Sequence, residues 1–278
     1  MKRVAVVGGG FLGMALARGL HAAGRRATVF EAAPGFGGLA NAWRLGDISW
    51  DRFYHVICLS DARTQALLKE LRLDDELVWG TTRTGFYTEG KLWSFSTNRE
   101  ILRFPPLNLW DKALLARTIF SAARETNWQK LENIPAVDWL RGLSGSRTTE
   151  KIWIPLLRSK LGADYAQASA AFIWATIQRM NSARRSGLKK EMFGYVRGGY
   201  GRIVDAFVAD LARRGVELRA GAAVQSIVRK QSNGFDVRLP GGAETFDEVV
   251  VAAPPPATLA LCPDLAGDVR DRLAGVRM

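Results

Sequence analysis

Three glycines near the start of the chain, Gly8, Gly10 and Gly13, have a spacing that can hold phosphate groups. In this GxGxxG pattern the first glycine permits a tight turn. The second lets the backbone approach a pyrophosphate, and the third lets a helix pack closely on a strand. Glu31 follows roughly 20 residues later, where a carboxylate can accept hydrogen bonds from both hydroxyls of an adenosine ribose. The spacing predicts a dinucleotide site without a 2′-phosphate; a plain glycine turn with a solvated glutamate is the alternative.

The elements needed to position these residues can be read from the same stretch. Residues 4–7 are β-prone, residues 11–23 carry apolar side chains at helical spacing, and residues 27–30 form a second short apolar run. Strand, glycine turn, helix and strand make a βαβ unit, whose crossover requires the two strands to be parallel. Phe11 and Leu12 then lie at the tip of the helix, where free N–H groups attract phosphates.

The rest of the chain divides by composition. Residues 61–197 hold seven of the nine tryptophans and predict a separate, largely helical domain, whereas the tail returns to α/β character. We therefore expect residues 1–60 and 198–278 to form one domain around an insert of residues 61–197. Helices are expected over residues 64–72, 109–126, 136–143, 149–161, 169–180 and 201–214, a hairpin within 81–96, and strands over 216–218, 223–229, 235–239 and 248–251.

A longer pattern extends the glycine turn. It consists of Gly8, Gly10, Gly13, Ala17, Leu20, Gly24, Val29, Glu31, Gly37 and Gly38. This combination resembles the N-terminal fingerprint of the superfamily of FAD-dependent amine oxidases, phytoene desaturases and protoporphyrinogen oxidases. Residues 198–224 and 247–254 resemble two later segments of that superfamily. In relatives the backbone at the position of Val224 meets the adenine, and the strand within the second segment lies beside the cofactor.

The resemblance implies a fold, a cofactor and an activity. The fold is α/β, a Rossmann-like FAD-binding domain with a parallel sheet plus an inserted, mainly helical substrate domain. The cofactor is FAD, and the reaction is two-electron oxidation or desaturation of an organic, apolar or anionic substrate. A mutase of the UDP-galactopyranose type and a non-catalytic nucleotide-binding fragment are the alternatives. The implied cofactor-binding residues are Gly8, Gly10, Phe11, Leu12, Gly13, Glu31, Gly37, Gly38, Val224 and Ala252.

The chain departs from the family pattern in two places. Leu39 stands where many relatives have a basic residue near the pyrophosphate, so helix N–H groups, Arg44 or Arg52 would meet the phosphate charge. Relatives also continue past the equivalent of Met278 into a second glycine-containing flavin motif. We therefore expect a C-terminally truncated chain with an incomplete second FAD-domain segment and with catalytic residues that this sequence does not identify. His55 resembles a histidine that approaches the flavin in several relatives, although a packed structural histidine is an equal alternative.

Composition narrows the remaining possibilities. The formal charge of +12 favours anionic partners, and seven basic residues against one acid occur between residues 179 and 202. Few aromatics are interleaved with them, so we expect no nucleic-acid binding. Two histidines and two widely spaced cysteines predict neither a metal site nor a disulfide framework. The chain is expected to be cytoplasmic with no spanning segment; peripheral membrane contact and the oligomeric state are left open.

Overall fold

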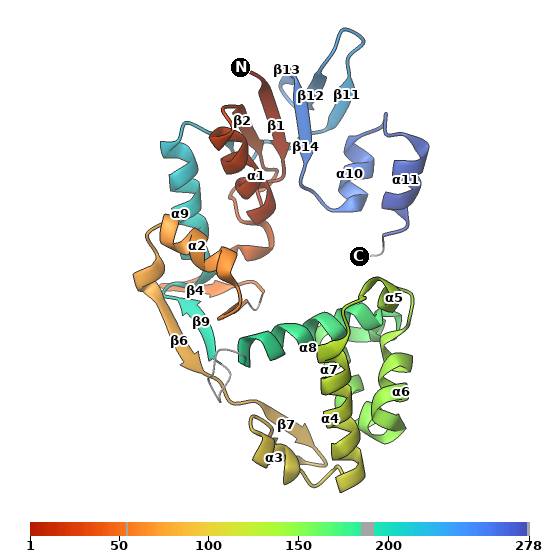
Figure 1. Cartoon of the computed structure of the whole chain (residues 1–278). Helices are drawn as coiled ribbons and strands as arrows, with labels where there is room; N and C mark the ends of the chain where they lie inside the picture. The colour runs from red at the N-terminus through yellow and green to blue at the C-terminus, as the bar shows by residue number, and fades with distance from the viewer. Residues whose placement is uncertain (54, 185–191, 277–278) are drawn as a thin grey trace. The chain divides into compact units, whose positions relative to one another are not determined.

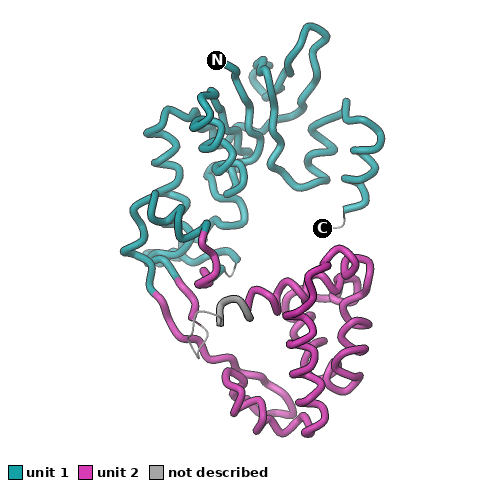
Figure 2. Tube along the Cα trace, viewed as in Figure 1, with its two compact units in different colours: residues 1–56, 63–78, 195–278 teal, residues 57–62, 79–194 magenta. Residues whose placement is uncertain are grey.

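The computed structural model describes residues 1–53, 55–184 and 192–276, and the chain folds into two compact units (Figure 2). Unit 1 comprises residues 1–56, 63–78 and 195–278, and unit 2 comprises residues 57–62 and 79–194. Unit 1 is therefore assembled from both ends of the chain and a short middle stretch.

Unit 1 is built on a four-stranded parallel sheet in the order β10-β2-β1-β14 (Figure 1). Val4, Ala5 and Val6 are fully buried, as in a strand that is covered on both faces. The strand from the far end of the chain pairs directly with the first one, so the predicted α/β class with a parallel sheet is confirmed. The elements of this layer are β1 (Arg3–Val7), α1 (Phe11–Ala22), β2 (Arg26–Phe30), β10 (Glu217–Arg219), β14 (Glu248–Val251) and α9 (Gly199–Arg213).

Several smaller elements of unit 1 were not predicted. The expected strand over residues 223–229 begins only at Ser226, and residues 242–246 form an additional strand. The proline run after β14 starts a helix that was not predicted, and proline is well tolerated in the first helical turn. The remaining elements that lie wholly or mainly in unit 1 are β3 (Ala42–Leu45), β4 (Ile48–Asp51), α2 (Ala62–Glu70), β11 (Ser226–Arg229), β12 (Phe235–Leu239), β13 (Gly242–Phe246), α10 (Pro255–Leu261) and α11 (Gly267–Ala274). Strand β6 (Leu77–Thr81) begins in unit 1 and continues into unit 2.

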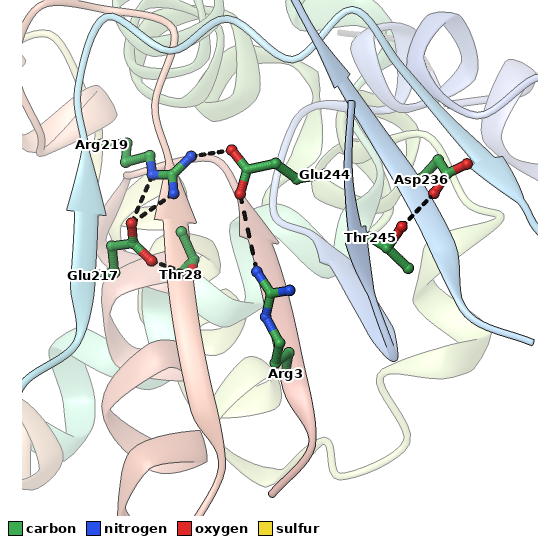
Figure 3. Close-up of polar contacts among 7 residues, drawn as sticks. All are labelled: Arg3, Thr28, Glu217, Arg219, Asp236, Glu244 and Thr245. Atoms are coloured by element: carbon green, nitrogen blue, oxygen red, sulfur yellow. Dashed lines mark hydrogen bonds and ion pairs between the residues drawn. The ribbon is translucent and has the colours of Figure 1, made fainter. Parts of the chain in front are cut away.

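A charged network links the parallel sheet to the antiparallel sheet β11-β12-β13 (Figure 3). Arg219 on β10 donates to Glu217 at 2.6 and 2.9 Å and also pairs with Glu244 on β13. Glu217 accepts a further hydrogen bond from Thr28 on β2 at 3.0 Å. The hydrogen bond from Arg219 lowers the pKa of Glu217 below its ordinary value, so this carboxylate is ionised at neutral pH.

A second network joins helices α1 and α9. The side chain of Asp210 is only 7% exposed, and it accepts from Arg214 at 2.7 Å, from Arg18 at 3.2 Å and from Arg213 at 3.3 Å. Burial by itself raises the pKa of Asp210, but the hydrogen bonds and charges of Arg214 and Arg18 outweigh it and lower the pKa. The carboxylate is therefore ionised and is shared by guanidinium groups from two helices.

Replacing Asp210→Asn is expected to lower the free energy of unfolding at pH 7 by about 2 kcal/mol, because it removes the buried carboxylate that Arg214 and Arg18 share and leaves Arg18 paired only with Glu70. The ionised carboxylate stabilises the fold fully above the ordinary aspartate pKa of 3.8. This stabilisation is lost as the pH falls through the lower pKa of the folded state. Denaturant unfolding of both proteins between pH 7 and pH 3 should therefore show the difference shrinking with acid. Asp205→Asn, at an exposed position of the same helix, should change stability by less than about 0.5 kcal/mol.

Unit 2 is a helical assembly with a short hairpin. Its core contains Phe104, Leu115, Leu140, Trp153 and Leu157, with Trp93, Trp139 and Trp174 packed against them. Four of the tryptophans of this region thus serve the core, whereas Trp110 and Trp128 are exposed. The expected helix over 149–161 begins with a wider π-type turn. The elements are β5 (Ile57–Cys58), β7 (Gly85–Thr88), β8 (Lys91–Ser94), α3 (Asn98–Leu102), α4 (Leu109–Arg124), α5 (Gln129–Glu132), α6 (Ala136–Thr148), α7 (Ile154–Leu161), α8 (Ala170–Arg184) and β9 (Met192–Val196), which continues into unit 1.

Within the described ranges, no helix combines the length and the apolar character needed to cross a bilayer. No three His, Cys, Asp or Glu side chains among the same residues gather into a group that could hold a metal ion. Part of the basic stretch noted in the sequence, including Arg185, Lys189 and Lys190, lies outside the described residues.

Candidate functional site

A cavity of about 950 Å³ opens in unit 1 at the carboxyl ends of β1, β2 and β14. This is the position at which open parallel sheets bind their ligands, and the volume is at the upper end for small-molecule sites. The cavity brings together ten of the residues predicted from the sequence: Gly8, Gly10, Phe11, Leu12, Glu31, Gly37, Gly38, His55, Val224 and Ala252.

The glycine turn between β1 and α1 is tightly packed. Gly8 has φ +112°, and a Cβ there would lie 2.6 Å from the carbonyl oxygen of Ala252. Gly13 is buried beneath this turn, where a Cβ would lie 1.9 Å from the carbonyl oxygen of Gly8. Gly13 does not line the cavity, so the structure gives it the helix-packing role of the third glycine.

The glycine pair of residues 37 and 38 packs against the first glycine turn. The Gly37 N–H donates to the Gly9 carbonyl at 2.9 Å, and Gly10 and Gly37 form an isolated parallel bridge. A Cβ on Gly38 would lie 3.1 Å from the Cα atom of Gly10. Two glycine segments that are separate in the sequence therefore form one backbone-lined wall of the cavity.

Glu31 is held in a fixed position at the end of β2. Its Oε2 accepts from the Gly9 N–H at 2.6 Å, and its Oε1 accepts from the Ala33 N–H at 2.8 Å. The Glu31 backbone is fixed in turn, because its N–H donates to the Arg219 carbonyl and its carbonyl accepts from the Ala222 N–H. Each carboxylate oxygen has a second lone pair, so the side chain can still accept hydrogen bonds from a ligand.

The anion-binding capacity of the cavity comes from backbone. Helix α1 begins after Gly10 with neither a side-chain cap nor an acidic residue in its first turn, so its N–H groups and its positive dipole end are available. Among the described residues that line the cavity, none is lysine or arginine. Arg44 and Arg52 are therefore not part of the lining, whereas Leu39 is. Of the two groups of donors expected to meet phosphate charge, the start of α1 lines the cavity and the two arginines do not.

An aromatic pair lines another part of the cavity. The rings of His55 and Tyr200 are 4.8 Å apart at a tilt of 40°, and Nδ1 of His55 lies 2.7 Å from the Phe53 carbonyl oxygen. Tyr200 also contacts Phe11 edge to face, at 6.2 Å between centroids. Sequence reasoning did not select Tyr200 as a site residue, although it follows the recognised glycine pair of residues 198 and 199.

Helix α10 supplies lining residues that the sequence did not identify. Ala257, Ala260 and Leu261 face the cavity from this helix, and Pro254 precedes it. The proline run followed by alternating small and apolar residues is the signal that could have revealed this helix.

Asp51, at the end of β4, fixes the start of the helix that carries Tyr200. Its Oδ1 accepts from the Tyr200 N–H at 2.8 Å, and the Tyr195 hydroxyl donates to its Oδ2. A Cβ on Gly199, where φ is +74°, would lie 2.7 Å from the same carboxylate. Asp51 therefore caps α9 from another element and positions Tyr200 through the backbone.

We expect Asp51→Ala to lower the free energy of unfolding by about 2 kcal/mol, because the helix start and the Tyr195 hydroxyl lose a charged acceptor. Thermal and denaturant unfolding would measure this change. Asp47→Ala, in the exposed turn of the same hairpin, is the matched control and should be nearly neutral. Equal stabilities of the two variants would contradict the capping role of Asp51.

Comparisons with known proteins agree with this geometry. Residues 13–272 match the family model of flavin-containing amine oxidoreductases. No curated protein sequence is similar enough to count as a match. Among solved structures, a candidate protoporphyrinogen oxidase from Exiguobacterium sp. 255-15 is 20% identical, with a TM-score of 0.71; the alignment covers 98% of this chain and 63% of that one.

Two further structures have the same fold. Wild-type putrescine oxidase bound to putrescine is 18% identical with a TM-score of 0.75, and a CLA-producing fatty acid isomerase from P. acnes is 17% identical with a TM-score of 0.71. Each alignment includes 98% of this chain and 63% of the other protein's chain. These structures show the fold, and the family model spans nearly the whole sequence. With its two glycine segments, Glu31 and the last sheet strand gathered around one cavity, the chain belongs to the family of flavin-containing amine oxidoreductases.

Proposed function

We propose that the cavity of unit 1 binds FAD and that the protein is an FAD-dependent oxidoreductase. The observation that carries the proposal is the convergence of the α1 tip, Glu31 and Val224 on one cavity of about 950 Å³. The chain spans 63 to 64% of the length of the structures named above and of a related oxidoreductase from Methanosarcina mazei. The activity is therefore inferred from the family and from this site.

The residues present fit the parts of FAD. The N–H groups at Phe11 and Leu12 would hold the pyrophosphate, and Glu31 would accept hydrogen bonds from the adenosine ribose. Val224 would contact the adenine, as the family resemblance implies. The side chains of His55 and Tyr200 line the same cavity and are the candidates for contact with the flavin ring.

The chemistry is two-electron transfer. When bound, FAD accepts the electrons that a substrate gives up in oxidation or desaturation. The protein's own groups would bind the cofactor, orient it and limit the access of water. Among substrates, an organic molecule with apolar or anionic character suits the basic, tryptophan-rich sequence.

The test is the absorption spectrum of the purified protein. The expected result is a flavin spectrum that loses its bound features on denaturation, with FAD rather than FMN in the supernatant. Anaerobic bleaching of the flavin by an added amine, porphyrinogen or polyprenoid would assign the substrate class. Turnover of a UDP-linked galactose without net oxidation would instead assign a mutase. A folded protein that takes up no added FAD would refute the proposal.

A further inference from the structure

The hairpin of β3 and β4 has two unlike faces. The strands pair antiparallel with Trp43 opposite Trp50 and Leu45 opposite Ile48. Directly opposed residues and residues two apart on one strand share a face, so these four side chains form a single apolar face. The alternate pairs, Ala42 with Asp51 and Arg44 with Ser49, define the other face.

The second face packs on helix α9. A Cβ on Gly201 would lie 3.3 Å from the Ala42 Cβ and 3.4 Å from the Ser49 Oγ, and Asp51 binds the backbone of Tyr200. The hairpin is therefore fixed against the helix by this side. Its opposite face, which we call the apolar hairpin face (Trp43, Leu45, Ile48 and Trp50), points away from α9.

The apolar hairpin face is open. Trp43, Leu45, Ile48 and Trp50 are 50, 57, 61 and 62% exposed. Together they present on the order of 500 Å² of side-chain surface, near the upper limit of what a soluble monomer exposes in one patch. A surface of this size composed only of tryptophan and aliphatic side chains indicates an apolar partner.

The charges beside the face favour an anionic partner. Arg52 follows β4 directly, is exposed and has no ion pair within the described residues. Arg44 is also exposed, but its register places it on the face of the hairpin that packs on α9. Two acids lie nearby. Asp51 is engaged by Tyr200 and Tyr195, whereas Asp47 is exposed in the turn of the hairpin. The whole chain carries a formal charge of +12.

We propose that the apolar hairpin face docks on the surface of an anionic lipid bilayer. Tryptophan is the residue type that prefers the interface between headgroups and acyl chains, and guanidinium groups beside it pair with anionic headgroups. A second copy of the chain fits less well. The face offers less than the roughly 800 Å² per partner of a standard interface, and two chains of charge +12 repel each other.

Sedimentation of the full chain with vesicles tests this inference. We expect roughly tenfold tighter binding to vesicles of equal phosphatidylcholine and phosphatidylglycerol than to pure phosphatidylcholine, and weaker binding as salt is raised. The double substitution Trp43→Ser with Trp50→Ser should reduce the partition coefficient by about tenfold or more. Arg52→Gln should reduce the preference for the anionic lipid.

Trp110→Ser is the matched control, because Trp110 is a 71% exposed tryptophan on α4 of unit 2. It should leave vesicle binding unchanged, and an equal loss there would overturn the assignment to the hairpin. Melting temperatures within a few degrees of the wild type show that the variants remain folded. A wild-type protein that does not bind vesicles of either composition would overturn the proposal. If its dimerisation, measured by light scattering, also depends on Trp43 and Trp50, the partner is a second copy.

Discussion

Replacing Gly13→Ala is expected to abolish FAD retention and to lower the free energy of unfolding by about 3 kcal/mol. A Cβ at this position would lie 1.9 Å from the Gly8 carbonyl oxygen, a distance that no side-chain rotation can relieve. Either α1 or the glycine turn must move, and the turn is held by its contact with Ala252 and by Gly37. The cost is that of overpacking a rigid site.

Gly19→Ala is the matched control for this prediction, because it is the same substitution in the same helix. Gly19 is exposed, and no atom lies within 4 Å of the position its Cβ would take. Alanine should stabilise the helix there by about 0.5 to 1 kcal/mol and leave FAD binding unchanged. Denaturant unfolding and FAD titration measure both effects. If Gly13→Ala were as stable as Gly19→Ala and kept its flavin, the packing of the turn described above would be wrong.

Glu31→Ala should raise the dissociation constant for FAD by roughly 100-fold, or about 2.7 kcal/mol. The change removes a charged acceptor from the ribose and also leaves the Gly9 and Ala33 N–H groups without their partner. Glu31→Gln keeps one carbonyl acceptor, and its dissociation constant for FAD should rise by only about tenfold. Titration of the apoprotein with FAD, followed by fluorescence, measures these constants. Glu132→Ala, at an exposed position in unit 2, should bind FAD as the wild type does.

A selectivity measurement separates ribose recognition from a general disturbance of the loop. The wild type should bind ADP more tightly than ADP carrying a 2′-phosphate, because the carboxylate repels that phosphate. Glu31→Ala should reduce the ratio of the two affinities. A variant that merely loosens the loop would weaken the binding of both ligands by the same factor. An unchanged ratio would show that Glu31 does not face the ribose.

The site near the N-terminus could be predicted because its information is local. A glycine turn of defined spacing, an amphipathic helix and an acid at the end of the next strand all lie within a single βαβ unit. The glycine pair of residues 37 and 38 and Ala252, directly after β14, were assigned through the family resemblance, and all three line the same cavity. Residues lining the cavity from α10 were missed, because no element was predicted after the strand over residues 248–251.

The sequence by itself determined the parallel α/β core, the predicted dinucleotide turn and the position of Glu31, since each depends on backbone preferences and on short-range spacing. Only the tertiary structure decided that Asp51 caps the helix carrying Tyr200, that Asp210 is shared by three arginines, and that one face of the β3–β4 hairpin is left exposed. These features depend on which surfaces meet when distant segments pack. The residue types of an amphipathic hairpin or a buried carboxylate do not specify which partner will cover them.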